Sequence, residues 1–347
     1  MGGIMTAIAN SKIAIINTPA AMPVSESLLK SSIKRLLRNR FAVVGIVVII
    51  GFILVALFAD TIALYPYEKT TLRASDSMPA WVANLFGVLP KEQGGYGKIN
   101  ETYPLGADGL GRDIFSRIVY GTRVSLGVAF VGPVVAIVVG LILGLMSGYF
   151  GGWIDNIIMR ITDIMYAFPT LLLIILLMAF FRPSSGSLEP GSFADTMNRL
   201  DASTGGMLFI FFGIGLTSWM QLARLTRGQV LSTREMEYVQ AARSLGATDW
   251  TIMLRHVLPN IVGPLIVAET LTIPRYVSYE AFLSFIGLGV NPPTPSWGAM
   301  ISEGSTAIRT YPHQAIFPAL ALFLLMFAFN FLGDGLRDAL DPRMRGS

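Results

Sequence analysis

Cysteine is absent from the 347-residue chain, and the only histidines are His256 and His313. The lack of cysteine excludes disulfide bonds, cysteine-ligated zinc, iron–sulfur centres and thiol nucleophiles. Two histidines offer little material for a histidine-built metal site. The net charge is only +4, so composition gives no reason to expect nucleic-acid binding. We therefore expect this chain itself to hold no metal and no cofactor.

Charged residues are also scarce, at 14% of the chain, against about 25% in an average soluble protein. Five stretches of 18 residues or more contain no Lys, Arg, Asp or Glu: residues 41–59, 124–154, 164–181, 202–223 and 310–333. A helix needs about 20 apolar residues to cross the hydrocarbon core of a bilayer. The sequence therefore predicts an all-α integral membrane protein.

The apolar stretches predict six transmembrane helices, at residues 41–64, 124–147, 158–181, 206–225, 258–288 and 315–333. The fifth stretch is too long for one straight crossing, so we expect it to kink and continue as a re-entrant or surface segment. The expected divisions are a tail (1–40), the first span (41–64), an outer loop (65–120), a core of five spans (121–335) and a second tail (336–347). Lys and Arg are more numerous in the segments on the side of the two tails, which predicts that both termini lie in the cytoplasm.

Residues 111–119 place Ile114, Phe115, Ile118 and Val119 on one side of a helix, with Arg117 turned toward the lipid headgroups. We interpret this segment as an amphipathic helix on the outer surface, either a partner contact or a simple interface helix. The second span carries several glycines, including Gly127, Gly132, Gly140, Gly144 and Gly148, and the last four of these are spaced by eight or four residues. This spacing favours close packing against other spans over the lining of a pore.

The polar loop between the fourth and fifth spans, residues 226–258, has strong helical periodicity. Ser232 with Glu235 resembles a capping box, and Tyr238, Ala241, Ala242 and Leu245 fall on one face. Gly246 is placed to end this helix in a left-handed conformation, and Thr248 can cap a second one. On the second helix an apolar face is shared by Trp250, Met253, Leu254, Val257 and Leu258. Periodicity alone is equally compatible with a passive hairpin, a membrane anchor or a docking surface.

The residues of this loop resemble a known motif. Gln240-Ala241-Ala242, Gly246 and Leu258-Pro259 match the spacing of the cytoplasmic EAA loop of binding-protein-dependent ABC importer permeases, with Gln240 in place of Glu and His256 in place of Ile. Segments beginning at Pro104, Gly148, Glu280, Pro292 and Gly333 resemble the peptide and nickel permeases of that family. The extra N-terminal span and the C-terminal tail are most similar to the C-type oligopeptide permease.

The resemblance implies a type I importer fold with a coupling helix in the EAA loop. It also implies several partners: a second permease in a heterodimer, two ATPases that bind ATP and magnesium, a substrate-binding protein outside the membrane, a peptide substrate and surrounding lipid. The location implied is the bacterial inner membrane. By this resemblance the ATPase-coupling residues are Glu237, Gln240, Ala241, Ala242, Leu245, Gly246 and Asp249. The sequence carries no Walker motif, so ATP hydrolysis is expected on other chains.

Glu269 and Arg275 are charged residues in or near the fifth span, where an unpaired charge costs a few kcal/mol. Our hypothesis is that one of them faces the translocation cavity and meets a peptide terminus; the alternative is local pairing at the interface. Dipeptide, nickel or glutathione import remains open, although the scarcity of histidine and cysteine favours peptides over nickel. A secondary transporter would often show inverted repeats, and a membrane hydrolase a catalytic set; neither pattern is evident in the sequence.

Overall fold

The computed structural model describes residues 28–181 and 191–340, and most of these residues are helical. Five helical runs are long and apolar enough to cross a membrane: α2 (Arg40–Leu57), Ile114–Phe150, α10 (Met207–Thr233), Asp249–Phe285 and α15 (His313–Leu340). A bent pair, α7 (Gly152–Ala167) and α8 (Thr170–Phe181), makes a sixth span if the two are counted together. The predicted all-α membrane fold is confirmed.

Two of the long runs contain π-helical turns. Ile114–Phe150 consists of α5 (Ile114–Val135), the turn Ala136–Gly140 and α6 (Leu141–Phe150). Asp249–Phe285 consists of α12 (Asp249–Thr251), the turn Ile252–Val257 and α13 (Leu258–Phe285). The predicted re-entrant continuation of the fifth span is wrong, because α13 passes through Pro264 and Pro274 without a break. The packed surroundings of a membrane helix commonly tolerate proline in this way.

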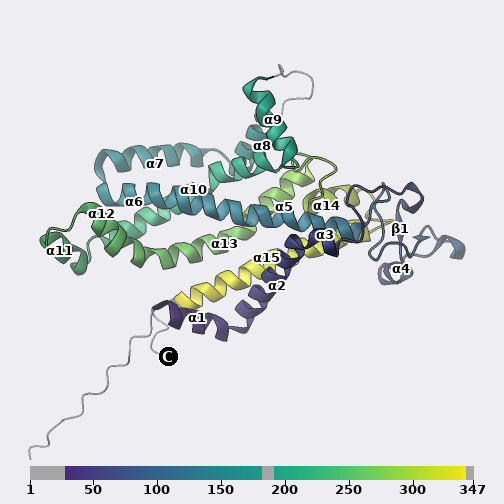
Figure 1. The fold of residues 1–347 in the computed structure, drawn as a ribbon, viewed down its shortest axis with the longest axis horizontal. Helices are drawn as coiled ribbons and strands as arrows, with labels where there is room; N and C mark the ends of the chain where they lie inside the picture. The colour runs from purple at the N-terminus through teal and green to yellow at the C-terminus, as the bar shows by residue number, and fades with distance from the viewer. Residues whose placement is uncertain (1–27, 182–190, 341–347) are drawn as a thin grey trace, which may run out of the picture.

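The shorter elements gather at the two ends of the bundle (Figure 1). At one end lie α1 (Leu28–Arg38), the last turns of α15 and α11 (Glu237–Ser244). At the other lie α3 (Ala59–Ile62), α4 (Ala80–Phe86), α9 (Phe193–Ser203) and α14 (Trp297–Ser305). The two ends of the described chain therefore lie on the same side of the bundle as α11.

Both expected tails contain helix. Residues 28–38 of the expected 1–40 tail form α1, which packs against α15, and Asn39 then begins α2 by accepting hydrogen bonds from the backbone N–H groups of Phe41 (3.1 Å) and Ala42 (3.3 Å). Residues 336–340 of the second tail continue α15. The rest of these tails, residues 1–27 and 341–347, lies outside the described residues.

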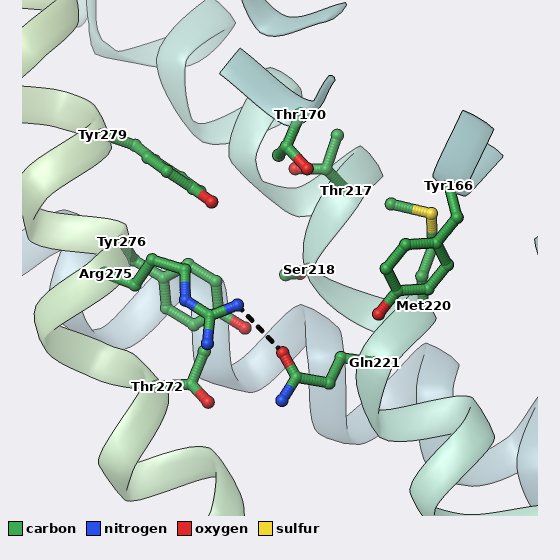
Figure 2. A pocket seen from close by; sticks show the side chains of 10 residues that line it. All are labelled: Tyr166, Thr170, Thr217, Ser218, Met220, Gln221, Thr272, Arg275, Tyr276 and Tyr279. Atoms are coloured by element: carbon green, nitrogen blue, oxygen red, sulfur yellow. Dashed lines mark hydrogen bonds between the residues drawn. The ribbon is translucent and has the colours of Figure 1, made fainter. Parts of the chain in front are cut away.

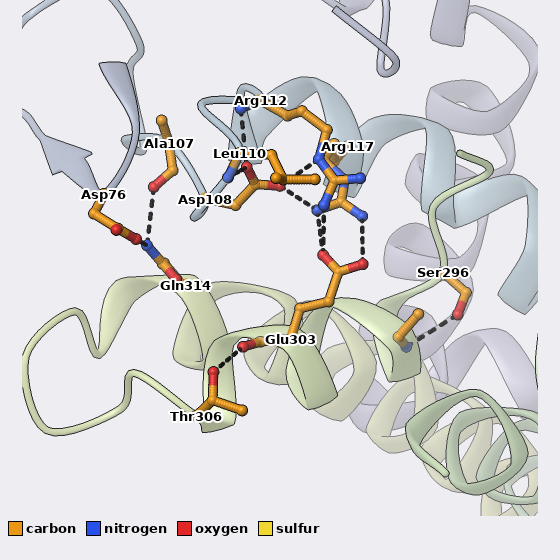
Figure 3. Close-up of polar contacts among 11 residues, drawn as sticks. Asp76, Ala107, Asp108, Leu110, Arg112, Arg117, Ser296, Glu303, Thr306 and Gln314 are labelled. Atoms are coloured by element: carbon orange, nitrogen blue, oxygen red, sulfur yellow. Dashed lines mark hydrogen bonds and ion pairs between the residues drawn. The ribbon is translucent and has the colours of Figure 1, made fainter. Parts of the chain in front are cut away.

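The predicted surface helix at 111–119 is wrong. Asp113 caps α5 directly, accepting from the backbone N–H groups of Phe115 and Ser116, so the span begins at Ile114. The side chain of Arg117 is only 2% exposed. Its guanidinium contacts Asp108 at 2.5 Å and Glu303 at 2.7 Å, as Figure 3 shows. Helical periodicity had placed Arg117 among the lipid headgroups. In the structure, its ion pairs with Asp108 and Glu303 hold it in the protein interior instead.

The same ion cluster fixes the outer loop to the bundle. Arg112 contacts Asp108 at 2.7 Å and Glu303 of α14 at 2.8 Å (Figure 3). The amide of Gln314, at the start of α15, donates to Asp76 at 2.9 Å and to the Ala107 carbonyl at 3.1 Å. The loop is therefore an ordered layer. It contains α4, two short 3₁₀ helices (Leu72–Ala74 and Lys91–Gln93) and a parallel pair of strands, β1 (Ser77–Met78) and β2 (Lys98–Ile99).

The expected third span is broken. The axes of α7 and α8 differ by 85°, and the break lies at Phe168 and Pro169. Proline has no backbone N–H and disfavours a helical conformation in the residue before it. Phe168 accordingly adopts an extended backbone, with φ −89° and ψ 134°.

The glycines of the second span pack against neighbouring helices, as predicted. A Cβ added to Gly144 would lie 2.5 Å from the Thr226 Cβ and 2.6 Å from the Ala223 carbonyl oxygen, both on α10. Gly140 and Gly148 approach α10 in the same way, while Gly127 meets Phe211 and Gly132 meets Tyr276. Small residues let two membrane helices approach closely.

We predict that Gly144→Ala lowers the free energy of unfolding by about 1–3 kcal/mol, because the added methyl overlaps α10. Gly51→Ala in α2 is the matched control, since a Cβ there meets nothing within 4 Å. It is expected to be neutral or to stabilise by up to about 1 kcal/mol, since alanine favours helix over glycine. The midpoint of thermal unfolding at a fixed scan rate tests both. Equal midpoints for the two variants would contradict close α6–α10 packing.

Candidate coupling surface and polar face

Helix α11 forms a short elbow between two long spans. It begins after Met236 and ends in a Schellman motif: Gly246 N–H donates to the Arg243 carbonyl (3.0 Å) and Ala247 N–H to the Ala242 carbonyl (3.1 Å). Gly246 has φ +85°, the left-handed conformation that the sequence predicted. A Cβ there would meet nothing within 4 Å, so glycine is favoured by backbone conformation alone.

The predicted capping box is wrong. Ser232 lies within the last turns of α10, which continues to Thr233, and Met236 is the residue before the first turn of α11. The second predicted helix is likewise the first part of the fifth span, although Thr248 does cap it by accepting from the backbone N–H of Thr251 (3.4 Å). Only part of its predicted apolar face is buried. Met253 and Val257 are buried, whereas Trp250 is 63% exposed and Leu254 is 51% exposed.

Most of the predicted coupling residues lie on the exposed side of the elbow. The exposed ones are Glu237, Gln240, Ala241, Leu245, Gly246 and Asp249, and Ala242 is partly buried. Leu245 is 88% exposed, which is unusual for a leucine inside a folded chain. Ala241 is therefore not buried against the fourth and fifth spans.

The opposite side of the elbow is held firmly by the bundle. Val239 is fully buried in a cluster with Tyr149, Val230, Ile252 and Met253. The Tyr149 hydroxyl donates to Asp249 at 2.7 Å, and Arg243 donates to that hydroxyl at 3.5 Å. This bond to Tyr149 raises the pKa of the Arg243 guanidinium above its usual range. Asp249, which was predicted at the docking surface, therefore connects the elbow to α6 through Tyr149. The sequence patterns did not indicate that Tyr149 would take part in this contact.

A bidentate ion pair braces the helices beside the elbow. Arg227 on α10 contacts both carboxylate oxygens of Asp155 on α7, each at 2.6 Å. Nearby, Arg234 donates to the Gly148 carbonyl at 2.8 Å and Arg224 pairs with Asp163. Asp155 and Asp163 of α7 therefore make structural ion pairs with α10.

Glu269 and Arg275 have different environments in α13. Glu269 is buried, and its carboxylate accepts a hydrogen bond from the Tyr276 hydroxyl at 2.8 Å. Arg275 is exposed, and its Nη1 donates to the Gln221 side-chain oxygen on α10 at 3.0 Å. No ion pair joins them within the described part of the chain. Glu269 and Arg275, which the sequence analysis treated as alternatives for one role, therefore have different surroundings: Glu269 is buried and Arg275 is exposed.

Arg275 lies in a pocket between three helical segments (Figure 2). The lining residues come from α7 and α8 (Tyr166, Thr170), α10 (Thr217, Ser218, Met220, Gln221) and α13 (Thr272, Arg275, Tyr276, Tyr279). The hydroxyls of Tyr166 and Tyr279 point toward the centre from opposite sides. Arg275 is the only charged residue among the ten that line it.

Two family models match the chain. "Binding-protein-dependent transport system inner membrane component" covers residues 140–346, and "N-terminal TM domain of oligopeptide transport permease C" covers residues 27–80. The oligopeptide transport system permease protein OppC of Bacillus subtilis (strain 168) is 37% identical over 321 residues, 92% of each chain. The glutathione transport system permease protein GsiD of Shigella flexneri serotype 5b is 40% identical over 317 residues, 90% of each chain.

Among solved structures, inward-facing MetNI methionine ABC transporter has a chain with 18% identity and a TM-score of 0.49, matched over 65% of this chain and 96% of that chain. The family models and the relatives agree over nearly the whole sequence. The chain is therefore a multi-pass, non-catalytic permease subunit of a binding-protein-dependent ABC importer, and it belongs to the OppC-type permeases of the peptide and glutathione branch.

Proposed function

We propose that this chain is the permease of an oligopeptide importer, pairing with a second permease to enclose a pathway that alternates between the two sides of the membrane. The observation that carries the choice of cargo is the match of residues 27–80 to the N-terminal domain of oligopeptide permease C. The relative from Bacillus subtilis, similar over 92% of each chain, supports the same choice.

The exposed side of α11 is the proposed contact with an ATPase. A coupling element must be stiff to transmit force, and the buried Val239 with the Tyr149–Asp249 hydrogen bond provides that stiffness. It must also present a small, complementary surface. Ala241 and Leu245 leave an apolar patch exposed to water, which a partner would bury favourably.

We infer that the end of the bundle carrying α1, α11 and the last turns of α15 lies in the cytoplasm, with both termini. The proposed docking of ATPases and the excess of Lys and Arg in these segments support this orientation. The ordered outer layer, together with α9 and α14, would then face the substrate-binding protein on the other side. The bacterial inner membrane is the corresponding location.

Glutathione is the second candidate cargo. The permease GsiD of Shigella flexneri is 40% identical to this chain, slightly more than the oligopeptide relative. Import of dipeptides or nickel has no comparable support among these relatives.

Cargo choice can be tested with the binding protein of this importer. We expect excess unlabelled oligopeptides of four or five residues to reduce uptake of a labelled oligopeptide to below about a tenth, while glutathione leaves it unchanged. Uptake of labelled glutathione, with no uptake of the labelled oligopeptide, would assign the chain to glutathione import.

The docking surface is tested by Leu245→Asp, which places a charge in the proposed apolar contact. We expect this variant to reduce co-purification of the ATPases at least about tenfold, equivalent to about 1.4 kcal/mol or more of binding free energy. Leu245→Met is the matched control and should retain binding, since it keeps the side chain apolar and of similar size. Equal recovery of ATPase with Leu245→Asp, at equal membrane levels, would place the contact elsewhere.

The orientation is tested by single-cysteine labelling, because the natural chain has no cysteine to remove. Leu72→Cys lies in the outer layer and Trp250→Cys beside the elbow, at sites 76% and 63% exposed. A membrane-impermeant maleimide should label Leu72→Cys in intact cells with permeable outer envelopes, and Trp250→Cys only after the inner membrane is opened. The reverse pattern would invert the topology and exclude α11 from contact with cytoplasmic ATPases.

A further inference from the structure

Helix α10 (Met207–Thr233) exposes a polar face along its second half, from the middle of the helix to its end beside the elbow. Its exposed residues from Gln221 onward are Gln221, Arg224, Gly228 and Ser232, at spacings of three, four and four, which align along one side of a helix. Polar and charged groups facing hydrocarbon are costly, and those found within spans usually face the protein interior or a water-filled cavity. At its Gln221 end, in the middle of the helix, this face therefore suits an aqueous pathway or another chain better than lipid.

Arg275 extends this polar face onto α13. Its side chain is exposed, and within the described residues it makes no ion pair; its hydrogen bond is to the neutral amide of Gln221 at 3.0 Å. Arg224 and Arg227, on the adjoining helix, each pair with an aspartate instead. A guanidinium has five N–H donors, so Arg275 keeps donors for a further acceptor.

The pocket around Arg275 has the chemistry of an anion site. None of its ten lining residues is acidic, and the nearby Glu269 is buried and bonded to Tyr276. The hydroxyls of Tyr166 and Tyr279 point into the same pocket from opposite sides (Figure 2). An arginine with spare donors suits a planar carboxylate, which it can bind through two parallel hydrogen bonds.

We infer that Arg275 binds the free α-carboxylate of the cargo during its passage, so that the permease selects cargo with an unblocked carboxyl end. This inference rests on the proposed function, because it requires the polar face of α10 and α13 to line the pathway. Oligopeptides and glutathione both carry such a carboxylate. The inference assigns contact with the cargo to Arg275 and gives Glu269 a structural role.

The test compares a tripeptide bearing a free carboxylate with the same tripeptide as its C-terminal amide. Both are supplied, with the binding protein, to the complete importer in proteoliposomes, and the ratio of acid to amide transport is measured. The binding protein has its own preference, but that preference is common to every permease variant and cancels when ratios are compared. A parallel arm with glutathione and its glycine amide distinguishes the two sources of carboxylate.

We expect Arg275→Gln to lower the acid-to-amide ratio about tenfold, the usual size of a lost charge-assisted hydrogen bond. Arg275→Lys should retain most of the preference, and Arg160→Gln is the matched control because its exposed side chain lies on α7, outside the pocket lining. Gln221→Glu provides a second variant if Arg275→Gln fails to assemble. Its new carboxylate would occupy Arg275 internally, and it should lower the ratio in the same way.

An acid-to-amide ratio unchanged from that of the unaltered complex in both Arg275→Gln and Gln221→Glu would overturn the inference while leaving peptide import intact. If only the Gln221→Glu complex assembles, its acid-to-amide transport ratio alone tests the inference. Failure of the proposed function would be seen differently, as an unaltered complex that transports neither tripeptide nor glutathione, and the inference would then fail with it.

Discussion

The cost of placing charge in an apolar bundle is the constraint on which this structure depends. Arg117 is nearly inaccessible, and the buried Asp108 and the partly exposed Glu303 compensate its charge. Near the elbow, Arg227 of α10 and Asp155 of α7 neutralise each other's charge in an ion pair. Both pairs join segments distant in sequence, so charge neutralisation also fixes how the helices meet. Arg275 departs from this pattern, which is why we assign it a role with cargo.

The paired charges and the buried side chains together make the elbow a rigid extension of the bundle. Val239 of α11 packs with Tyr149 of α6, Val230 of α10 and Ile252 before α13. Three spans therefore contact the base of one short helix. A force applied at Leu245 would reach all three through close-packed side chains, which deform little. The same α10 and α13 carry the polar face with Arg275, so the proposed site of force and the proposed pathway share two helices.

Sequence patterns predicted the features that depend on local composition. The apolar stretches predicted the membrane fold, the position of Gly246 predicted the end of α11, and the glycine spacing predicted close packing of the second span, because each signal lies in nearby residues. Features set by distant partners were missed. The inward turn of Arg117 depends on Glu303, far along the chain, and the stiffness of the elbow depends on Tyr149, about 100 residues before Asp249. The bend at Phe168 and Pro169 had a local signal in the proline, which was outweighed by the hydrophobicity of the segment.

The central claim is that an ATPase drives this permease through the exposed tip of α11. The most direct measurement is photocrosslinking in the complete importer, with a short benzophenone probe attached to Leu245→Cys as the only cysteine in this chain. We expect the main adduct to join this chain to an ATPase subunit, and its yield to change when ATP is bound without hydrolysis. Adducts confined to lipid or to the second permease, in a complex that still transports cargo, would contradict the claim.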